Sequence, residues 1–364
     1  MKKPALLLLL IAPLAISAQK KVDLDKFNFT AQYRALPQVQ IDTTYHTYNV
    51  EVEGTQIMKS YLQELQPEES VELEGWRKLR SNGHITIKVK VDDLLPESVS
   101  IKERIENTKN KAGAIIGTKI FYSQEVIYSF AATAIITDYK GSHLTDVVLD
   151  TRSYKKTYTG PEFPIKEIAA GYFLANSFKL TRELYRKSLN TSLHYLSSRI
   201  STDYGYRAVN VKDHMWIVDS KKHPEYNAHR KAFLALNDIF FRMDANTPID
   251  NIRKEAQPVI AYFESIKKRY SSSSKHDRKI RYASYFNLAV LYYYLDDPQM
   301  MMKEASGLVL NDFDSKDGKG FEQTAIWLKD LFDQTNRNTR HFPIDIQSFR
   351  GPYEKKYYDN ARSL

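Results

Sequence analysis

The stretch "HITIKVKVD", residues 84–92, decides the fold of the first half of this sequence. Isoleucine and valine at positions 85, 87, 89 and 91 alternate with threonine and lysine at the positions between them. A period of two places successive side chains on opposite faces of an extended chain, so the pattern predicts a strand with one dry and one wet face. Full burial of the four branched side chains is worth about 1.5–3 kcal/mol each. This strand therefore requires a second apolar layer to pack against.

The same period recurs on both sides of that strand. It is clear in "YHTYNVEVE" (45–53), weaker in "SVSIKERIE" (98–106) and present again in "TDVVLDTRSYKKTYT" (145–159). The segment "IFYSQEVIYSFAATAIITDY" (120–139) is apolar on both faces, which favours central strands covered on both sides, with a buried helix as the alternative. One helix is expected in "GTQIMKSYLQEL" (54–65), where Ile57, Tyr61 and Leu65 recur every four residues. We therefore predict a β-rich domain over residues 19–160, with antiparallel strands arranged like a β-sandwich.

The pattern changes at "TGPEFPIK" (159–166), where Gly160, Pro161 and Pro164 interrupt the strands. Beyond it, apolar residues follow helical spacing through seven segments, which predicts an all-α domain of helical hairpins over residues 161–336. Thr247 and Asp297 each precede a proline and are expected to cap the fourth and the sixth of these helices. Residues 337–364 mix arginine, proline, glycine and tyrosine without a period, so we expect an irregular basic and aromatic tail, either draped on the body or disordered. The predicted fold class is α+β.

One segment of the helical half resembles a tetratricopeptide-type repeat. In "ASYFNLAVLYYYLDDPQMMMKEASGLVLNDF" (283–313), Ala289 and Tyr292 stand where that family places a small residue and a tyrosine, and Leu308 falls at a small position of the second helix. The segment departs from the family at Met301, where alanine is expected, and at Phe313, where proline is expected. The resemblance implies stacked helical hairpins that present a groove to a peptide or protein, although any pair of packed antiparallel helices gives a similar pattern.

The first residues, "MKKPALLLLLIAPLAISAQK", predict an export signal over residues 1–18. Two lysines precede an apolar run at 5–16, and small residues before Gln19 suit cleavage near Ala18. The alternative is a retained anchor helix, which Pro13 and the shortness of the run disfavour. The sequence has no cysteine, which excludes disulfides, thiol-linked lipid anchors and cysteine-ligated zinc. We expect an exported protein, periplasmic or secreted, without a transmembrane helix.

The net charge of +9 belongs to the second half, because residues 164–364 carry 32 lysines and arginines against 24 acids. Such an excess suits an anionic glycan or membrane surface; a nucleic acid is not expected, since neither an aromatic RNA-binding signature nor a zinc finger is present. The alternative is a solvated loop flanked by lysine-rich helix ends. The cluster that would meet the surface brackets the serine-rich segment 271–274 and consists of Lys267, Lys268, Arg269, Lys275, Arg278, Lys279 and Arg281.

The segment "STDYGYRAVNVKDHMWIVDSKKHPEY" (201–226) is a long connection between predicted helices, and long connections are often functional. Aromatic rings beside carboxylates stack on sugars and bind their hydroxyls, so the segment is a candidate site for a glycan or another ligand. The alternative is a packed loop or small hairpin in which the tryptophan side chain is buried as part of its core. The candidate residues are Asp203, Tyr204, Tyr206, Asp213 and Trp216.

No metal or cofactor is expected. His214, His223 and His229 do not have the spacing of a metal site, and the sequence contains no nucleophile elbow, phosphate loop or dinucleotide fingerprint. These absences disfavour an enzyme without excluding one. The leading hypothesis is an exported, non-enzymatic envelope protein that binds or scaffolds a protein or peptide through its helical domain. The alternative hypothesis is a glycan-binding or glycan-cleaving protein that uses residues 201–226.

Overall fold

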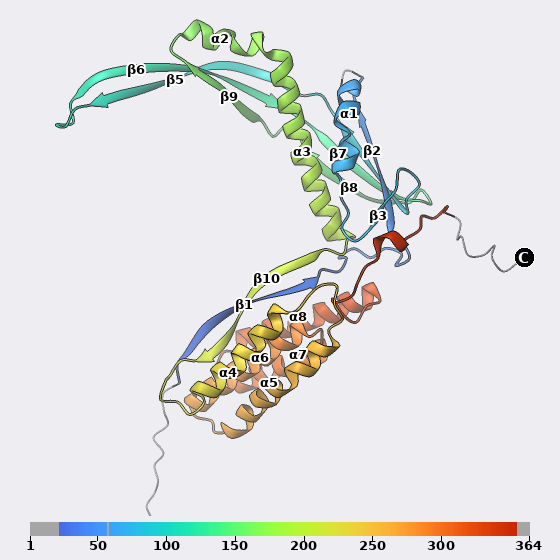
Figure 1. Ribbon diagram of the computed structural model, residues 1–364, viewed down its shortest axis with the longest axis vertical. Coiled ribbons are helices and arrows are strands. Elements are labelled where there is room, and N and C mark those ends of the chain that lie inside the picture. The colour runs from blue at the N-terminus through green and yellow to red at the C-terminus, as the bar shows by residue number, and fades with distance from the viewer. Residues whose placement is uncertain (1–21, 57, 355–364) are drawn as a thin grey trace, which may run out of the picture. The chain divides into compact units, whose positions relative to one another are not determined.

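The computed structural model describes residues 22–56 and 58–354 and has an α+β fold, with β-sheets followed by a run of helices packed in hairpins (Figure 1). The predicted signal segment and Ile57 lie outside the described residues. Two compact units are built from discontinuous segments. The helical unit contains the chain up to Tyr33, Val209–Asp333 and Arg337–Phe342, and the sheet unit contains Arg34–Ala208, Gln334–Asn336 and the chain from Pro343 onward.

A five-stranded mixed sheet forms the core of the sheet unit. Its strand order is β3 (Arg77–Lys78), β2 (Thr47–Gly54), β4 (Ile85–Val91), β7 (Ala132–Asp138) and β8 (His143–Asp150). The stretch 84–92 contains the central strand β4, and the four branched side chains of this strand are all buried, as its period predicts. The expectation that 120–139 forms central strands is confirmed in part: β7 lies between β4 and β8, but only one of its faces is buried, because Thr133 is exposed and Ile135 is half-buried.

The prediction of antiparallel strands is wrong for β2 and β4, which run parallel with Tyr48 opposite Ile85. Parallel neighbours need a crossover connection, and residues 55–84 supply it with helix α1 (Lys59–Leu65) and the short 3₁₀ turn Pro67–Ser70. Asn49 lies on the face of β2 that the pattern assigns to water, yet its side chain is buried. Its Oδ1 accepts hydrogen bonds from the Gly83 N–H (2.8 Å) and the Thr86 hydroxyl (3.0 Å), which satisfies the oxygen of the buried amide.

A second, antiparallel sheet has the order β5 (Leu95–Lys109), β6 (Ile115–Ser129) and β9 (Lys156–Phe163). Gly160, where the sequence pattern changes, lies inside β9. Helix α2 (Lys166–Ala175) packs on this sheet, and the long helix α3 (Ser177–Asp203) packs against β7 and β8 (Figure 1). Leucines at 180, 184, 189, 193 and 196 are buried along α3, so a helix covers these strands where a sandwich would have a sheet.

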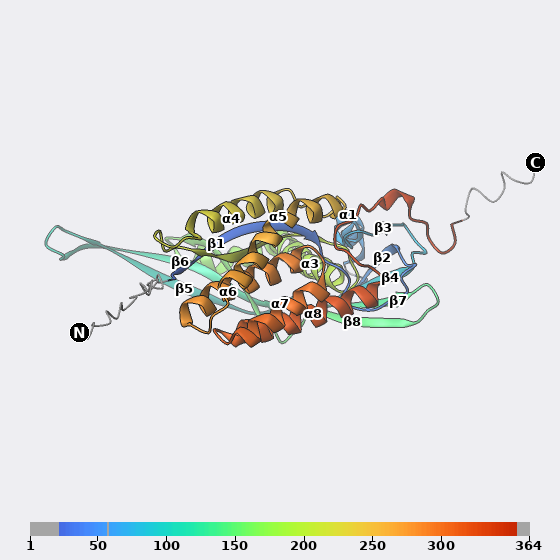
Figure 2. The same ribbon diagram turned by 90° about the horizontal axis from the view of Figure 1, so that it is seen from below.

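The helical unit combines a strand pair with five helices. Strand β1 (Leu24–Arg34) pairs with β10 (Ala208–Val218), and the two arrows run in opposite directions (Figure 1). Strand β1 runs alongside the helices of this unit (Figure 2). Phe29 of β1 stacks on Phe240 at a centroid distance of 4.3 Å, and Met215 and Ile217 of β10 belong to the same core. The helices are α4 (Tyr226–Phe241), α5 (Asp250–Arg269), α6 (Lys275–Tyr294), α7 (Pro298–Asn311) and α8 (Ser315–Thr335).

Two predicted helix caps have different outcomes. The Asp297 carboxylate accepts a hydrogen bond from the Met300 N–H (3.0 Å), and Pro298 takes the first position of α7 as predicted. Helix α5 begins at Asp250 with Ile249 before it, so the predicted cap at Thr247 is wrong. The Thr247 N–H bonds back to the Asp244 carbonyl oxygen (3.4 Å), because this residue closes a turn before the helix starts.

The described part of the tail is ordered against the body of the protein. Arg340 is buried in the helical unit and forms an ion pair with Asp296 at 2.6 Å. Farther on, Glu354 forms an ion pair with Arg77 of the sheet unit at 2.9 Å. Within the described ranges, none of the helices combines the length and the apolar character needed to cross a membrane.

Candidate binding groove in the helical unit

The five candidate residues of segment 201–226 divide between the two units. Asp203, Tyr204 and Tyr206 belong to the sheet unit, whereas Asp213 and Trp216 lie on β10 in the helical unit. The segment is therefore the end of α3 followed by a strand, and its two aromatic parts have to be considered separately.

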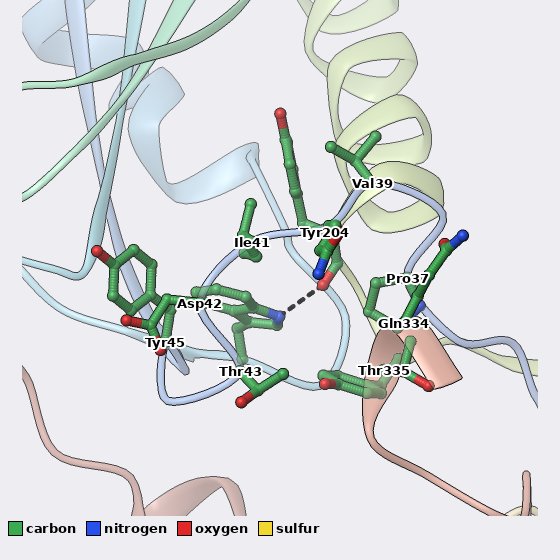
Figure 3. Close-up of a pocket in the computed structure, with 12 residues that line it drawn as sticks. Pro37, Val39, Ile41, Asp42, Thr43, Tyr45, Tyr204, Gln334 and Thr335 are labelled. Carbon is green, nitrogen blue, oxygen red and sulfur yellow. Dashed lines mark hydrogen bonds between the residues drawn. The ribbon is translucent and has the colours of Figure 1, made fainter. Parts of the chain in front are cut away.

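Tyr204 and Tyr206 line a cavity together with Tyr45 and Trp76, and Figure 3 shows the lining residues. The cavity has a volume of about 20 Å³, which accommodates little more than one water molecule. The Trp76 indole N–H donates to the Tyr204 carbonyl oxygen at 2.9 Å, drawn as the dashed line in Figure 3. The geometry leaves no room for a sugar ring, so these aromatic residues act as packing in the present structure.

Asp203, the third residue of this group, is buried at the end of α3. One of its carboxylate oxygens accepts a hydrogen bond from the Arg199 guanidinium at 2.7 Å, one helical turn earlier. Its role visible in the structure is an ion pair within α3.

The larger hollow lies in the helical unit, between β1, β10, α6 and α8, and has a volume of about 410 Å³. We call it the groove. A volume of this size is typical of a binding site for a small molecule or a few side chains. One wall is apolar and consists of Trp216, Phe286, Val290 and Phe321, and the rim is charged and consists of Lys26, Asp213, Lys316 and Asp317.

Trp216 is held in place through its backbone by Asn287 of α6. The Trp216 N–H donates to Asn287 Oδ1 at 2.8 Å, and Asn287 Nδ2 donates to the Trp216 carbonyl oxygen at 2.8 Å. A strand of a two-stranded sheet has one unpaired edge, and buried backbone groups on that edge need partners. The buried Asn287 amide supplies both and fixes the indole beside Phe286, with ring centroids 6.1 Å apart.

Both acids on the rim are engaged by buried tyrosines. The Tyr294 hydroxyl donates to Asp213 Oδ2 at 3.0 Å, and the Tyr282 hydroxyl donates to Asp317. Burial and, after it, these carboxylates raise the pKa of both tyrosines, so each hydroxyl stays protonated and remains a donor. The acceptor capacity of the two carboxylates is therefore partly used inside the protein.

The side chains of the two rim lysines, unlike those of its two acids, have no hydrogen-bonded partner among the described residues. The Lys26 ammonium lies 5.2 Å from the centroid of the Trp216 ring, a cation–π contact. In the described part of the chain, neither Lys26 nor Lys316 has a carboxylate within 4.0 Å. The two lysines are therefore rim groups without an ion-pair partner among the described carboxylates, on a rim that carries two lysines and two aspartates.

His214 completes the aromatic side of the groove. Its ring lies 5.4 Å from Phe286 and 5.8 Å from Trp216, measured between centroids, and its Nδ1 is 3.5 Å from Asp213 Oδ1. Burial and the nearby Lys26 ammonium lower the pKa of His214, so the ring is neutral at pH 7.

No family model matches this chain, and none of the curated proteins compared with it matches.

The other two histidines considered for a metal site lie in the core of the helical unit. His223 and His229 are buried, and His229 packs against the ring of Phe263 at 5.2 Å. Across residues 22–56 and 58–354, the structure brings together no group of three His, Asp or Glu side chains that would hold a metal ion.

Most residues of the basic cluster that flanks the serine-rich segment contact acidic or amide side chains that lie elsewhere in the sequence. Lys267 lies between Glu264 (2.9 Å) and the buried Glu304 (2.6 Å). The remaining contacts join Arg269 to Glu225 at 3.0 Å, Arg278 to Asp312 at 3.1 Å, Lys279 to Asp23 at 3.8 Å, and Arg281 to Asn311 at 2.9 Å. Much of the positive charge is thus balanced inside the helical unit. Lys268 and Lys275 are the two members for which the structure gives no such contact among the described residues.

Asp213 and Trp216 were predictable as candidates from the sequence, whereas the parts of the groove that come from other elements were not. Gly320 of α8 carried a signal, because glycine inside a helix costs about 1 kcal/mol relative to alanine and usually has a reason. A methyl group added at Gly320 would meet no atom within 4 Å, so this glycine leaves the groove open. Phe286 carried no signal because it continues the apolar helix pattern of α6, and Asn287 carried none because a single polar residue in a helix is common.

Proposed function

We propose that the protein is an exported, non-enzymatic envelope protein whose helical unit binds a segment of a partner protein in the groove. The observation that carries the proposal is an open groove of about 410 Å³ whose apolar wall is accompanied by uncommitted lysines. Export rests on the composition of residues 1–18. An apolar side chain of the partner would fill the groove beside Phe286 and Phe321, and a neighbouring carboxylate would meet Lys26 and Lys316.

A glycan is the second candidate, because Trp216 and Asp213 lie together in the groove. A sugar needs an open aromatic face and free hydrogen-bonding groups. Here the Lys26 ammonium occupies a position over the Trp216 ring, and the Tyr294 hydroxyl already bonds to Asp213. These two contacts favour an apolar side chain over a sugar ring as the occupant.

The helical architecture supports a protein partner. Helices α6 and α7 form the hairpin of residues 283–313, and Ala289, Tyr292 and Leu308 are all buried there. We propose that this hairpin is of the tetratricopeptide type, whose stacked helices present side chains to peptides. The sheet unit, which the sequence predicted as a sandwich-like module, would serve as its stable support.

The experiment is selection from a displayed library of random peptides on the mature full-length protein, compared with the Gly320→Leu variant. Leucine fills the groove from an exposed helix position, so we expect the selected peptides to bind the variant at least about ten-fold more weakly. Gly171→Leu in α2 is the matched control, because its added side chain also meets open space. The proposal would be overturned by peptides that bind the wild type and Gly320→Leu equally. It would also be overturned if no peptide were selected and a glycan array yielded ligands whose binding Gly320→Leu weakens.

A further inference from the structure

The hairpin of β5 and β6 extends beyond the sheet to which it belongs. Strand β9 pairs with β6 only between Tyr122 and Tyr128, whereas the β5–β6 pairing continues to Lys109 and Ile115 (Figure 1). The outer part is therefore a two-stranded ribbon, exposed on both faces. Such ribbons are marginally stable alone in water, so an exposed one of this length is expected to have an external partner.

The tip of the ribbon is apolar and well defined. Residues 112–117 read Ala-Gly-Ala-Ile-Ile-Gly, and the side chains of Ile115 and Ile116 are 57% and 66% exposed. Asn110 Oδ1 accepts hydrogen bonds from the N–H groups of Ala112 (3.0 Å) and Ala114 (2.9 Å), and Gly113 takes the left-handed conformation that the turn requires. The turn thus presents the two isoleucines at the end of the ribbon.

The charges nearest the tip are positive, and the first acid along the ribbon is Glu106, which stands opposite Lys119 and forms an ion pair with Arg104 at 3.1 Å. Between Glu106 and Glu125 the sequence contains no acid and three lysines, Lys109, Lys111 and Lys119. Within the described ranges, none of these lysines has a carboxylate within 4.0 Å. The complementary surface is therefore anionic, and the Lys–Lys repulsion disfavours tip-to-tip pairing with a second copy of the chain.

We infer that the tip of the β5–β6 hairpin inserts into the headgroup layer of a membrane that contains anionic lipids. Ile115 stands opposite Lys109, and Ile116 is the extra residue of a β-bulge between this pair and the Thr108–Gly117 pair, so both isoleucines stand at the end of the ribbon. A lipid layer entered tip first surrounds both of these exposed side chains. The lysines then lie at the level of the lipid phosphates, where each contributes to binding.

The test is co-sedimentation of the mature full-length protein with vesicles of phosphatidylcholine, with and without phosphatidylglycerol. We expect binding only when phosphatidylglycerol is present, and weaker binding at high salt, since screening reduces the attraction. Lys119→Gln should weaken binding about five-fold. Ile116→Ser should weaken it about ten-fold or more, because a buried isoleucine is lost from the lipid layer.

Val148→Ser and Lys90→Gln are the matched controls, because both residues are exposed in the sheet unit away from this hairpin. Neither change should alter vesicle binding. Equal binding of wild type and Ile116→Ser, or binding that does not depend on phosphatidylglycerol, would contradict the inference. Sedimentation velocity without vesicles gives the remaining outcome. If the wild type does not bind vesicles but forms a dimer, and Ile116→Ser dissociates that dimer, the tip binds a second copy of the chain instead of a membrane.

Discussion

Asn287 binds both backbone groups of Trp216, and this pair of 2.8 Å hydrogen bonds joins the open edge of β10 to helix α6. The Asn287 side chain thus supplies the hydrogen bonds that a third strand would otherwise make with the edge of β10. It also explains why the aromatic wall of the groove is assembled from a strand and a helix that lie far apart in the sequence.

Replacing Asn287 with leucine should therefore destabilise the helical unit. The change removes both partners of Trp216 and leaves two backbone groups unsatisfied, at about 1–3 kcal/mol each. Urea unfolding should show a loss of about 2–6 kcal/mol in the free energy of unfolding. Asn251→Leu, an exposed position on α5, is the control and should change little. A stability loss no larger than that of the control would mean that the hydrogen bonds are replaced by water.

The buried pair Asp296–Arg340 should anchor the tail to the helical unit. Arg340 Nε donates to Asp296 Oδ1 at 2.6 Å, and its guanidinium lies 4.1 and 4.3 Å from the ring centroids of Tyr33 and Tyr293. Arg340→Met leaves a buried carboxylate without its cation, which should cost about 3–5 kcal/mol in unfolding experiments.

Two variants sharpen this test. The double variant Asp296→Asn with Arg340→Met should recover part of the loss, because no unpaired charge remains, and asparagine tolerates the left-handed backbone at position 296 (φ 56°). Arg350→Met is the control from the exposed part of the tail. A double variant less stable than Arg340→Met alone would show that the hydrogen bonds that the Asp296 carboxylate accepts from the Thr339 hydroxyl (2.9 Å) and the Arg340 N–H (2.6 Å) outweigh the cost of its unpaired charge.

His229 should make the stability of the helical unit depend on pH. Its ring is buried, neither ring nitrogen has a hydrogen-bond partner among the described residues, and burial, together with His223 and Arg230, lowers its pKa to about 3. A histidine in the unfolded chain has a pKa near 6.5. Between about pH 6.5 and pH 3 the unfolded chain therefore binds a proton at this residue, whereas the folded protein does not. Stability contributed by the neutral ring is complete above about pH 6.5 and is lost at about 1.4 kcal/mol per pH unit below it, down to about pH 3.

The measurement is the free energy of unfolding against pH for the wild type and His229→Phe. The difference between the two curves should be flat above about pH 6.5 and should shrink below it, because phenylalanine does not titrate. Parallel curves throughout the acid range would show that the unfolded state does not gain a proton at this position relative to the native state.

Local patterns predicted the elements, and distant partners determined their assembly. The strand β4 and the Asp297 cap of α7 were predictable because period and capping depend on neighbouring residues. The pairing of β1 with β10 was not, because Leu24–Arg34 has a strand pattern but no local feature that assigns it to the helical unit. The acids that neutralise the basic cluster, such as Glu304 opposite Lys267, escaped prediction for the same reason.

The candidate site shows the same limit. Tyr204 and Trp216 carry the same local signature, an aromatic ring near carboxylates in a segment without helical period. The structure places Tyr204 in a cavity of about 20 Å³ and Trp216 on a groove of about 410 Å³. Composition indicates that aromatic rings gather in a segment, but which ring faces open space depends on helices packed from elsewhere.

Two glycines of α8 provide a last prediction, because they occupy the same helix and differ only in their surroundings. A Cβ at Gly318 would lie 2.8 Å from Val309 Cγ2 and 2.9 Å from the Ala305 carbonyl oxygen, so Gly318→Ala must push α8 away from α7. A Cβ at Gly320 meets no atom within 4 Å, so Gly320→Ala should gain the helix preference of alanine, about 0.5–1 kcal/mol. Thermal unfolding should therefore show a lower Tm for Gly318→Ala and a higher Tm for Gly320→Ala. Two shifts of the same sign would mean that α8 does not pack against α7 as closely as the glycine contacts require.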